Sequence, residues 1–387
     1  MTAQLHVVVI GGGAAGMTTA YELISKGARV TVLEANALGS GSSGRSVGVV
    51  GTQMTDPFQI LLRRYAIPRF REWEAKGLIF HHIGYLRLAR TEAHMEAVHR
   101  SAEMQAAEGF RARVMSPEDM VQLIPHLSVE GLTGGIFGPD DGFIDPYQLC
   151  TLLGELVRAQ GGQIKQFCKV LEATRKGAGY RLETTKGPIE CDVVVNAAGA
   201  WAPKVAEMFG QTLHIFPERH EAMSILLDNP LEYTMPMVMD LIEGEGTGLN
   251  FRYEKPTELI SEIHKVSSPD PEDPDNYNDQ CMDSSREYLA ELLLERLPEL
   301  PGARLGRGWA GLYPMTADGK PFAGPINPDE PTLITAAGGG GYGIQLSPVI
   351  GIAAADWVLH GGITTAPGLE ALAPTPERNR PLVRKEH

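Results

Sequence analysis

Leu5-His-Val-Val-Val-Ile-Gly-Gly-Gly-Ala-Ala-Gly16 begins as a short apolar run and passes directly into glycines. A stretch with helical character continues to Lys26, and a second apolar run, Ala28-Arg-Val-Thr-Val-Leu-Glu34, ends on an acid. The glycines match the G-x-G-x-x-G fingerprint of dinucleotide-binding proteins. They also stand in the context that the fingerprint requires, which is a strand, a glycine turn, a helix, a second strand and an acid in this order. The stretch therefore predicts a Rossmann-type α/β domain that binds a dinucleotide.

Each glycine of the fingerprint has its own physical task. Gly11 allows the tight turn, Gly13 lets a pyrophosphate approach the backbone, and Gly16 lets the helix pack closely on the sheet. Ala14 and Ala15 begin the helix, where free N–H groups and the positive end of the helix dipole favour phosphates.

Glu34 and the adjoining Ala35 follow the second strand, where a carboxylate can accept hydrogen bonds from ribose hydroxyls. An acid at this position disfavours NADP, because it would repel a 2′-phosphate. The fingerprint alone does not separate NAD from FAD.

The chain has 387 residues, which predicts two intimately packed domains rather than one simple core. Its 43% hydrophobic and 21% charged residues are typical of a globular enzyme. A net charge of −14 and a pI near 5.3 argue against nucleic acid or an anionic membrane surface as a partner.

Cys150, Cys168, Cys191 and Cys281 are scattered, so neither a zinc site nor any other metal site is expected. Separated cysteines in a chain of this size indicate a reducing compartment. No apolar run reaches about 18 residues, and the chain runs almost directly into its first strand, so we expect no membrane span and no signal peptide. These features favour a cytoplasmic location.

The rest of the chain alternates elements in a way that predicts two interleaved domains. Residues 56–76, 92–109, 146–160, 284–297 and 345–360 have helical patterns, whereas 80–89, 164–183, 191–199, 221–227, 248–263 and 332–337 have strand patterns. The Val-rich run from Cys191 to Gly199 is typical of a buried parallel strand. The acidic, proline-rich residues 267–283 are interpreted as a solvated loop, and residues from Pro374 onward as a loose tail.

The expected architecture is a Rossmann-type α/β cofactor domain with an interleaved substrate domain built on a mixed β-sheet (α+β). We assign residues 1–78, 142–209 and 311–373 to the cofactor domain and residues 79–141 and 210–310 to the substrate domain, with a tail at 374–387.

Four later motifs carry a resemblance to a known family. They are Ser42-Ser-Gly-Arg-Ser46, Val193-Val-Val-Asn-Ala-Ala-Gly-Ala-Trp-Ala202, Trp309-Ala-Gly-Leu-Tyr-Pro-Met-Thr-Ala-Asp-Gly-Lys-Pro321 and Gly340-Gly-Tyr-Gly-Ile-Gln345. In this order they resemble the flavin-contacting segments of the D-amino-acid oxidase family, whose members include glycine oxidase, sarcosine oxidase and D-arginine dehydrogenase. The resemblance spans nearly the whole chain and implies FAD as the cofactor.

The resemblance implies further cofactor-binding residues beyond the fingerprint. A helix that starts near Ile344 would place its positive dipole end beside the flavin edge that becomes negative on reduction. The residues implied are Ser42, Ser43, Arg45, Ser46, Val170, Ala198, Gly199, Trp201, Gly311, Gly341, Tyr342, Gly343, Ile344 and Gln345. The family's covalent attachment residues have no counterpart near Gly311 or in Ser42–Gly51, so non-covalent FAD is expected.

In the family a hydride leaves the substrate for flavin N5, and an amine becomes an imine that water hydrolyses to a carbonyl product. Here the sequence departs from pattern, because Tyr313 stands where close relatives carry a carboxylate-binding arginine. Arg219 and Arg252 are candidates to bind the substrate carboxylate in its place. The alternative for each arginine is a structural ion pair. Gln345 matches D-arginine dehydrogenase rather than sarcosine oxidase. His220 is a candidate base or a structural histidine.

The leading prediction is FAD-dependent oxidation of a C–N bond in an amino acid or a secondary or N-alkyl amine. The electrons pass to oxygen or another acceptor; the absence of lysine in Thr257–Glu262 favours a dehydrogenase. Oxidation of a 2-hydroxy acid, or a role as the flavin subunit of a hetero-oligomeric dehydrogenase, are alternatives. The sequence leaves open whether the chain forms a homo-oligomer or a hetero-oligomer. It disfavours a role as a non-enzymatic scaffold that only binds FAD.

Overall fold

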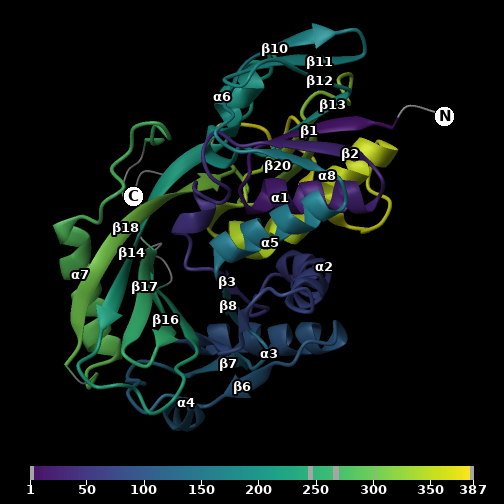
Figure 1. Ribbon diagram of the computed structural model, residues 1–387. Helices are drawn as coiled ribbons and strands as arrows, with labels where there is room; N and C mark the ends of the chain where they lie inside the picture. The colour runs from purple at the N-terminus through teal and green to yellow at the C-terminus, as the bar shows by residue number, and fades with distance from the viewer. Residues whose placement is uncertain (1–3, 243–246, 265–269, 301, 384–387) are drawn as a thin grey trace.

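The computed structural model describes residues 4–242, 247–264, 270–300 and 302–383. Figure 1 shows an α/β region around α1, α5 and α8, and a second region in which the long strands β14, β17 and β18 run away from it.

The α/β region is built on a six-stranded sheet with the order β19-β20-β13-β1-β2-β9. All neighbouring pairs are parallel except β19 with β20. Both β1 and β13 are buried along their whole length, as expected for parallel strands covered on both faces. The strands are β1 (His6–Ile10), β2 (Arg29–Leu33), β9 (Gln163–Lys165), β13 (Val193–Asn196), β19 (Phe322–Pro325) and β20 (Leu333–Ala337).

Three helices pack against this sheet, and a fourth packs on one of these helices. Helix α1 (Ala14–Ser25) lies against both α5 (Pro146–Ala159) and α8 (Gly343–His360), and α2 (Pro57–Glu74) lies against α8. Helices α1 and α8 approach closely, since a Cβ at Gly351 would lie 2.8 Å from the Thr18 carbonyl carbon. The Asp145 carboxylate caps α5 by accepting from the Tyr147 N–H at 2.8 Å, which confirms the predicted start of that helix.

One segment, Gly340–His360, is long and apolar enough to cross a membrane by length and composition. Within the described part of the chain it is the single such segment, and 72% of it is buried inside the protein. The buried core helix of a globular protein meets the same criterion, and α8 packs in this way against α1 and α2.

The second region is an eight-stranded sheet with the order β18-β14-β17-β16-β15-β5-β7-β6. It is antiparallel except where β15 pairs with β5, so it is the mixed sheet that the sequence predicts. The strands are β5 (Tyr85–Ala89), β6 (Arg113–Met115), β7 (Gly134–Gly138), β14 (Phe216–Leu226), β15 (Met237–Ile242), β16 (Thr247–Lys255), β17 (Glu258–His264) and β18 (Arg304–Met315).

Two small sheets and several short helices complete the structure. The sheets have the orders β3-β8-β4 and β10-β11-β12. Their strands are β3 (Val49–Val50), β4 (Phe80–His81), β8 (Gly142–Ile144), β10 (Val170–Lys176), β11 (Gly179–Thr184) and β12 (Ile189–Cys191). The remaining helices are α3 (Glu92–Ala107), α4 (Pro117–Leu123), α6 (Ala202–Glu207) and α7 (Asp283–Arg296), with 3-10 turns η1 (Ser43–Arg45), η2 (Gly199–Trp201), η3 (Gly340–Tyr342) and η4 (Leu369–Leu372).

Two predicted strand segments are divided. The single strand expected over 80–89 is two strands in different sheets, because Gly84 turns the backbone with φ +79° and donates its N–H to Asp141. The pair expected over 164–183 is the hairpin of β10 and β11, whereas β9 joins the six-stranded sheet at its edge.

The predicted loose tail is also wrong for its described residues, 374–383. The Arg378 guanidinium donates to Asp318 at 2.7 Å and lies 4.9 Å from the centre of the Phe322 ring. The Asn379 side chain accepts from the His214 N–H at 2.8 Å. Residues 384–387 lie outside the described structure. Elsewhere the domain division stays a prediction, and its boundary at 310/311 falls inside β18.

Candidate active site

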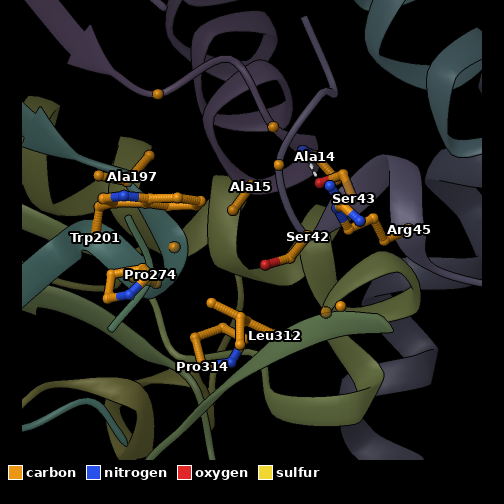
Figure 2. Close-up of a pocket in the computed structure, with 18 of the residues that line it drawn as sticks. Ala14, Ala15, Ser42, Ser43, Arg45, Ala197, Trp201, Pro274, Leu312 and Pro314 are labelled. Atoms are coloured by element: carbon orange, nitrogen blue, oxygen red, sulfur yellow. Dashed lines mark hydrogen bonds between the residues drawn. The ribbon is translucent and has the colours of Figure 1, made fainter. Parts of the chain in front are cut away.

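A cavity of about 610 Å³ runs from the glycine turn after β1 to the eight-stranded sheet. Figure 2 shows part of its wall, with Ala14, Ser42, Ser43 and Arg45 on one side and Trp201, Pro274, Leu312 and Pro314 around the remainder. The volume is typical of a site for a cofactor-sized ligand.

The glycine turn is built from close backbone contacts. Gly11 has φ +112°, and a Cβ there would lie 2.8 Å from the Ala197 carbonyl carbon. A Cβ at Gly16 would lie 3.0 Å from the Gly11 carbonyl carbon and still closer to its oxygen. Gly16 does not line the cavity itself; its missing side chain is what lets α1 begin directly against the turn.

The N-terminus of α1 opens onto the cavity. The Ala14 N–H donates to the Ser43 hydroxyl at 3.0 Å, a contact drawn in Figure 2. Backbone N–H groups at a helix N-terminus form an anion site, and a hydroxyl acceptor beside them marks the place where a phosphate oxygen can bind.

Glu34 lies at one end of the cavity and is held by the backbone. Its two oxygens accept from the N–H groups of Gly12 and Asn36, each at 2.7 Å. This fixes the carboxylate where a ribose hydroxyl can donate to its remaining lone pairs. Val170 lies at the same end and is 6% exposed.

Most cofactor residues expected from the sequence line this cavity. Those that do are Gly11, Gly13, Ala14, Ala15, Glu34, Ala35, Ser42, Ser43, Arg45, Ser46, Val170, Ala198, Gly199, Trp201, Gly311, Gly341, Gly343 and Ile344. Tyr342 and Gln345 instead line a smaller neighbouring cavity, where Gln345 Oε1 accepts from the Gly51 N–H at 3.3 Å.

Arg45 connects the turn η1 to the eight-stranded sheet. Its guanidinium donates to the Ala310 carbonyl at 3.0 Å and to Asp279 at 3.2 Å, and its own carbonyl accepts from Trp309 Nε1 at 2.8 Å. The side chain therefore holds the cavity wall together as well as lining it.

The far end of the cavity meets a polar face of the eight-stranded sheet. Tyr313 on β18 stacks on His220 of β14, with ring centres 3.9 Å apart. The Tyr313 hydroxyl donates to Glu262 Oε1 at 3.4 Å, and Asn250 donates to Glu262 Oε2 at 3.0 Å. His220 in turn contacts Glu218 at 2.6 Å through Nε2.

Burial shifts the pKa values of two side chains on this face, Glu262 and Tyr313. Burial raises the pKa of Glu262, and its hydrogen bonds to Asn250 and Tyr313 only partly oppose that shift. Burial, together with the Glu262 carboxylate, raises the pKa of Tyr313 well above its ordinary value, so the phenol stays a hydrogen-bond donor.

The structure does not bring Arg219 to either described cavity. Arg219 and His220 are successive residues of β14, so their side chains point to opposite faces of the sheet. His220 faces the cavity, whereas Arg219 pairs with Glu221 and donates to the Asn278 carbonyl at 2.7 Å. Its surroundings make it a structural ion pair rather than a carboxylate clamp.

Arg252 is also bound elsewhere. Its guanidinium donates to the Val47 carbonyl at 2.8 Å and to Glu254 at 2.5 Å, and it lies 3.7 Å from the centre of the Phe143 ring. Burial lowers its pKa. The residue fastens the loop after η1 to the sheet, and neither described cavity includes it among its lining residues.

The described part of the acidic insertion is a largely exposed loop, as predicted, but it also forms part of the cavity wall. Its described part, residues 270–282, which we term the cover loop, contributes Pro274, Asp275 and Tyr277 to the cavity wall. Trp201 Nε1 donates to Asp275 at 2.8 Å, and Lys204 pairs with the same carboxylate at 2.5 Å. Residues 267–269 of the prediction lie outside the described structure.

Glu262 and Asn250 are the functional candidates that sequence reasoning missed. In the register of the sheet Glu262 lies opposite both Ala222 and Asn250, so these residues share a face with His220. The acid stands within an apolar strand pattern, Glu258-Leu-Ile-Ser-Glu-Ile-His264, and an acid on the inward face of such a strand was the available signal.

The residues present fit FAD. A glycine turn without room for a Cβ, a helix N-terminus, a backbone-held carboxylate and an elongated cavity occur together, as a dinucleotide requires. At the opposite end, Gly343 and Ile344 begin α8 beside the cavity, where the positive end of the helix dipole favours an anionic flavin edge. Fold and site together define a flavin-dinucleotide oxidoreductase.

Comparison with known proteins places the chain more narrowly. Residues 6–357 match the model of the family described as FAD dependent oxidoreductase, the D-amino-acid oxidase group, and the chain belongs to that family. It is an FAD-dependent enzyme.

The relatives cover most of the chain. Glycine oxidase of Geobacillus kaustophilus is 26% identical over 92% of this chain and 94% of its own length. Mitochondrial dimethylglycine dehydrogenase of Mus musculus is also 26% identical over 92% of this chain, but the match spans 43% of that longer protein. The crystal structure of L-proline dehydrogenase from P. horikoshii is 26% identical with a TM-score of 0.85, covering 97% of this chain and 98% of its own.

Proposed function

We propose that the chain oxidises a C–N bond in an amino acid or a secondary or N-alkyl amine. A hydride leaves the carbon beside nitrogen, and water hydrolyses the resulting imine to a carbonyl product. The observation that carries the proposal is the acidic, hydrogen-bonded face of Glu262, Tyr313 and His220 at the far end of the FAD cavity. Glycine oxidase, dimethylglycine dehydrogenase and L-proline dehydrogenase, the relatives named above, all carry the names of amine substrates.

FAD, when bound, supplies the hydride acceptor for this chemistry. The chain's own residues bind and orient the reactants and keep water away. Leu312 and Pro314 of β18 form an apolar part of the wall, and the cover loop closes another side. The N-terminus of α8 stabilises negative charge at the flavin end, and Tyr313 donates its hydroxyl proton within the substrate end.

We further propose an electron acceptor other than oxygen, because Thr257–Glu262 contains no lysine at the strand where the family's oxidases place one near the flavin to promote reaction with oxygen. A cytoplasmic location is proposed on the four cysteines, all of which are free in the structure.

The proposal is tested by anaerobic mixing of the holoenzyme with N-alkyl amino acids, primary amino acids, simple amines and 2-hydroxy acids. We expect amines to remove the oxidised-flavin absorbance and to yield a carbonyl product after hydrolysis. Reduction by hydroxy acids with no reduction by any amine would refute C–N oxidation and favour the hydroxy-acid alternative. Aerobic and dye-linked assays with the best substrate then identify the acceptor.

A further inference from the structure

A small inner chamber adjoins the substrate end of the main cavity. It measures about 40 Å³ and shares Ser46, Glu262, Tyr313, Gly341 and Ile344 with the main cavity. A space of this size accommodates about three water-sized groups. It therefore suits one end of a small substrate, such as a nitrogen atom with two carbon substituents.

The chamber holds one acidic side chain. Among its described lining residues, Glu262 is the single Asp, Glu, Lys, Arg or His. Asn250 satisfies one carboxylate oxygen at 3.0 Å, whereas the Tyr313 hydroxyl reaches the other at the long distance of 3.4 Å. The second oxygen therefore retains capacity for a stronger donor.

The guanidinium of Arg252 makes its described hydrogen bonds to groups other than Glu262. Arg252 lies two residues beyond Asn250 on β16, but its donors are directed to Glu254 and to the carbonyls of Val47 and Tyr253. The described hydrogen bonds to Glu262 come from the neutral donors Asn250 and Tyr313, and a ligand that brings a positive charge offsets the cost of burying the carboxylate.

Three tyrosines and two methionines form the other walls. Tyr85 is 2% exposed, Met237 is 1% exposed and Met239 is 5% exposed, while Tyr313 and Tyr342 complete the lining. Aromatic faces attract alkylated ammonium groups through their quadrupoles, and thioethers provide adaptable apolar contact for methyl groups. A neutral hydroxyl group gains from neither the carboxylate charge nor the aromatic rings in this way.

We propose that Glu262 and the tyrosines of the inner chamber bind the alkylated ammonium group of the substrate. The enzyme thus selects small N-alkyl amines by their positive nitrogen, which explains a site that works without a buried arginine at position 313. This inference rests on the proposed C–N oxidation and names the substrate class that the same site takes. Glu262 acts as a specificity-determining residue.

The test uses two ligands of the same shape. N,N-dimethylglycine and 3-methylbutanoate share a carboxylate and a branched skeleton, and they differ in a protonated nitrogen against a carbon. Binding of 3-methylbutanoate to the anaerobic holoenzyme is followed by the change in flavin absorbance. Binding of N,N-dimethylglycine is followed by the concentration dependence of flavin reduction, or by the same absorbance change where the flavin stays oxidised. We expect the amine to bind at least about tenfold more tightly, and Glu262→Gln to reduce that preference to within about threefold.

Two further variants distinguish the loss of charge recognition at Glu262 from a loss of the folded structure. Glu262→Asp keeps the charge and should keep most of the preference. Glu258→Gln alters an acid on the same strand that pairs with Lys255 at 2.9 Å at the surface. This variant should change the binding of neither ligand. FAD content per chain, read from the visible spectrum, shows whether each variant is folded.

The inference is overturned if the wild-type enzyme shows no preference for the amine, or if the preference survives Glu262→Gln in a variant that retains FAD. The outcome is distinct from that of the proposed function. Preferential binding of N,N-dimethylglycine with no amine reducing the flavin would refute C–N oxidation and leave the chamber assignment intact. Reduction of the flavin by amines, together with equal binding of the two ligands, would support C–N oxidation and refute the chamber assignment.

Discussion

Replacing Gly16 by alanine tests whether the close contact between helix α1 and the glycine turn sustains FAD binding. A Cβ at this position would lie 3.0 Å from the Gly11 carbonyl carbon, 3.3 Å from Ala197 Cβ and closer still to the Gly11 oxygen. Real Cβ atoms essentially never lie within 3.0 Å of another atom, and the Gly11 atoms belong to the backbone, so no side chain can swing aside. The start of α1 must therefore move away from the turn.

Such overpacking against rigid atoms costs typically 1–3 kcal/mol, and we expect about 3 kcal/mol here. The N–H groups at Ala14 and Ala15 move with the helix, so the variant should also bind FAD at least about tenfold more weakly. Unfolding of the apoprotein by denaturant measures the first effect, and titration with FAD measures the second. Gly362→Ala is the matched control, because a Cβ there meets nothing within 4 Å. Wild-type stability and FAD affinity in Gly16→Ala would refute the packing argument.

Three further predictions concern other parts of the molecule. Burial raises the pKa of Asp141 from 3.8 to about 7. The folded state therefore binds a proton that the unfolded state releases, and stability falls as pH rises from about 4 to 7, by at most about 4 kcal/mol at 1.36 kcal/mol per pKa unit. Asp141→Asn should flatten unfolding free energy against pH across this window, and an unchanged slope would contradict the assignment. Arg219→Ala should lose about 3 kcal/mol, because Glu221 is left buried without its partner, while amine affinity stays within about twofold; a large loss of affinity with unchanged stability would restore the clamp hypothesis. Lys204→Met removes two half-exposed ion pairs to the cover loop, so it should cost less than about 1 kcal/mol yet speed FAD release in stopped-flow chase experiments; an unchanged release rate would show that the loop does not control exit.

The cofactor half of the site was predictable because its constraints are local in sequence. Gly11, Gly13 and Gly16 lie within six consecutive residues. A phosphate site at a helix N-terminus needs only backbone groups, which such a short segment supplies. The same holds for the α5 cap at Asp145 and for the buried strand β13. Turns and capping residues express short-range preferences that a single sequence displays.

The substrate half depends on which residues of distant strands share a face. Arg219 and His220 are adjacent in sequence, and only the register of β14 with β17 and β18 shows that His220 meets Tyr313 and Glu262 while Arg219 lies behind the sheet. Composition alone likewise predicted a solvated loop at the acidic insertion. The loop is largely exposed, but composition did not show that its acids also pair with cations of the cofactor region, as Asp279 does with Arg45.

The absence of an arginine at position 313 has a consequence for the charge of the whole substrate end. In a cavity that excludes water, a lone carboxylate and a lone guanidinium favour ligands of opposite sign, since each enclosed charge is stabilised mainly by its ligand. With Tyr313 in this position, Glu262 is the one Asp, Glu, Lys, Arg or His among the described residues that line the inner chamber. An amino acid can then bind with its ammonium group inward and its carboxylate toward the main cavity. Under the proposed binding mode, the sheet recognises the ammonium group of the substrate through Glu262 and Tyr313, while the cofactor half of the fold stays the same.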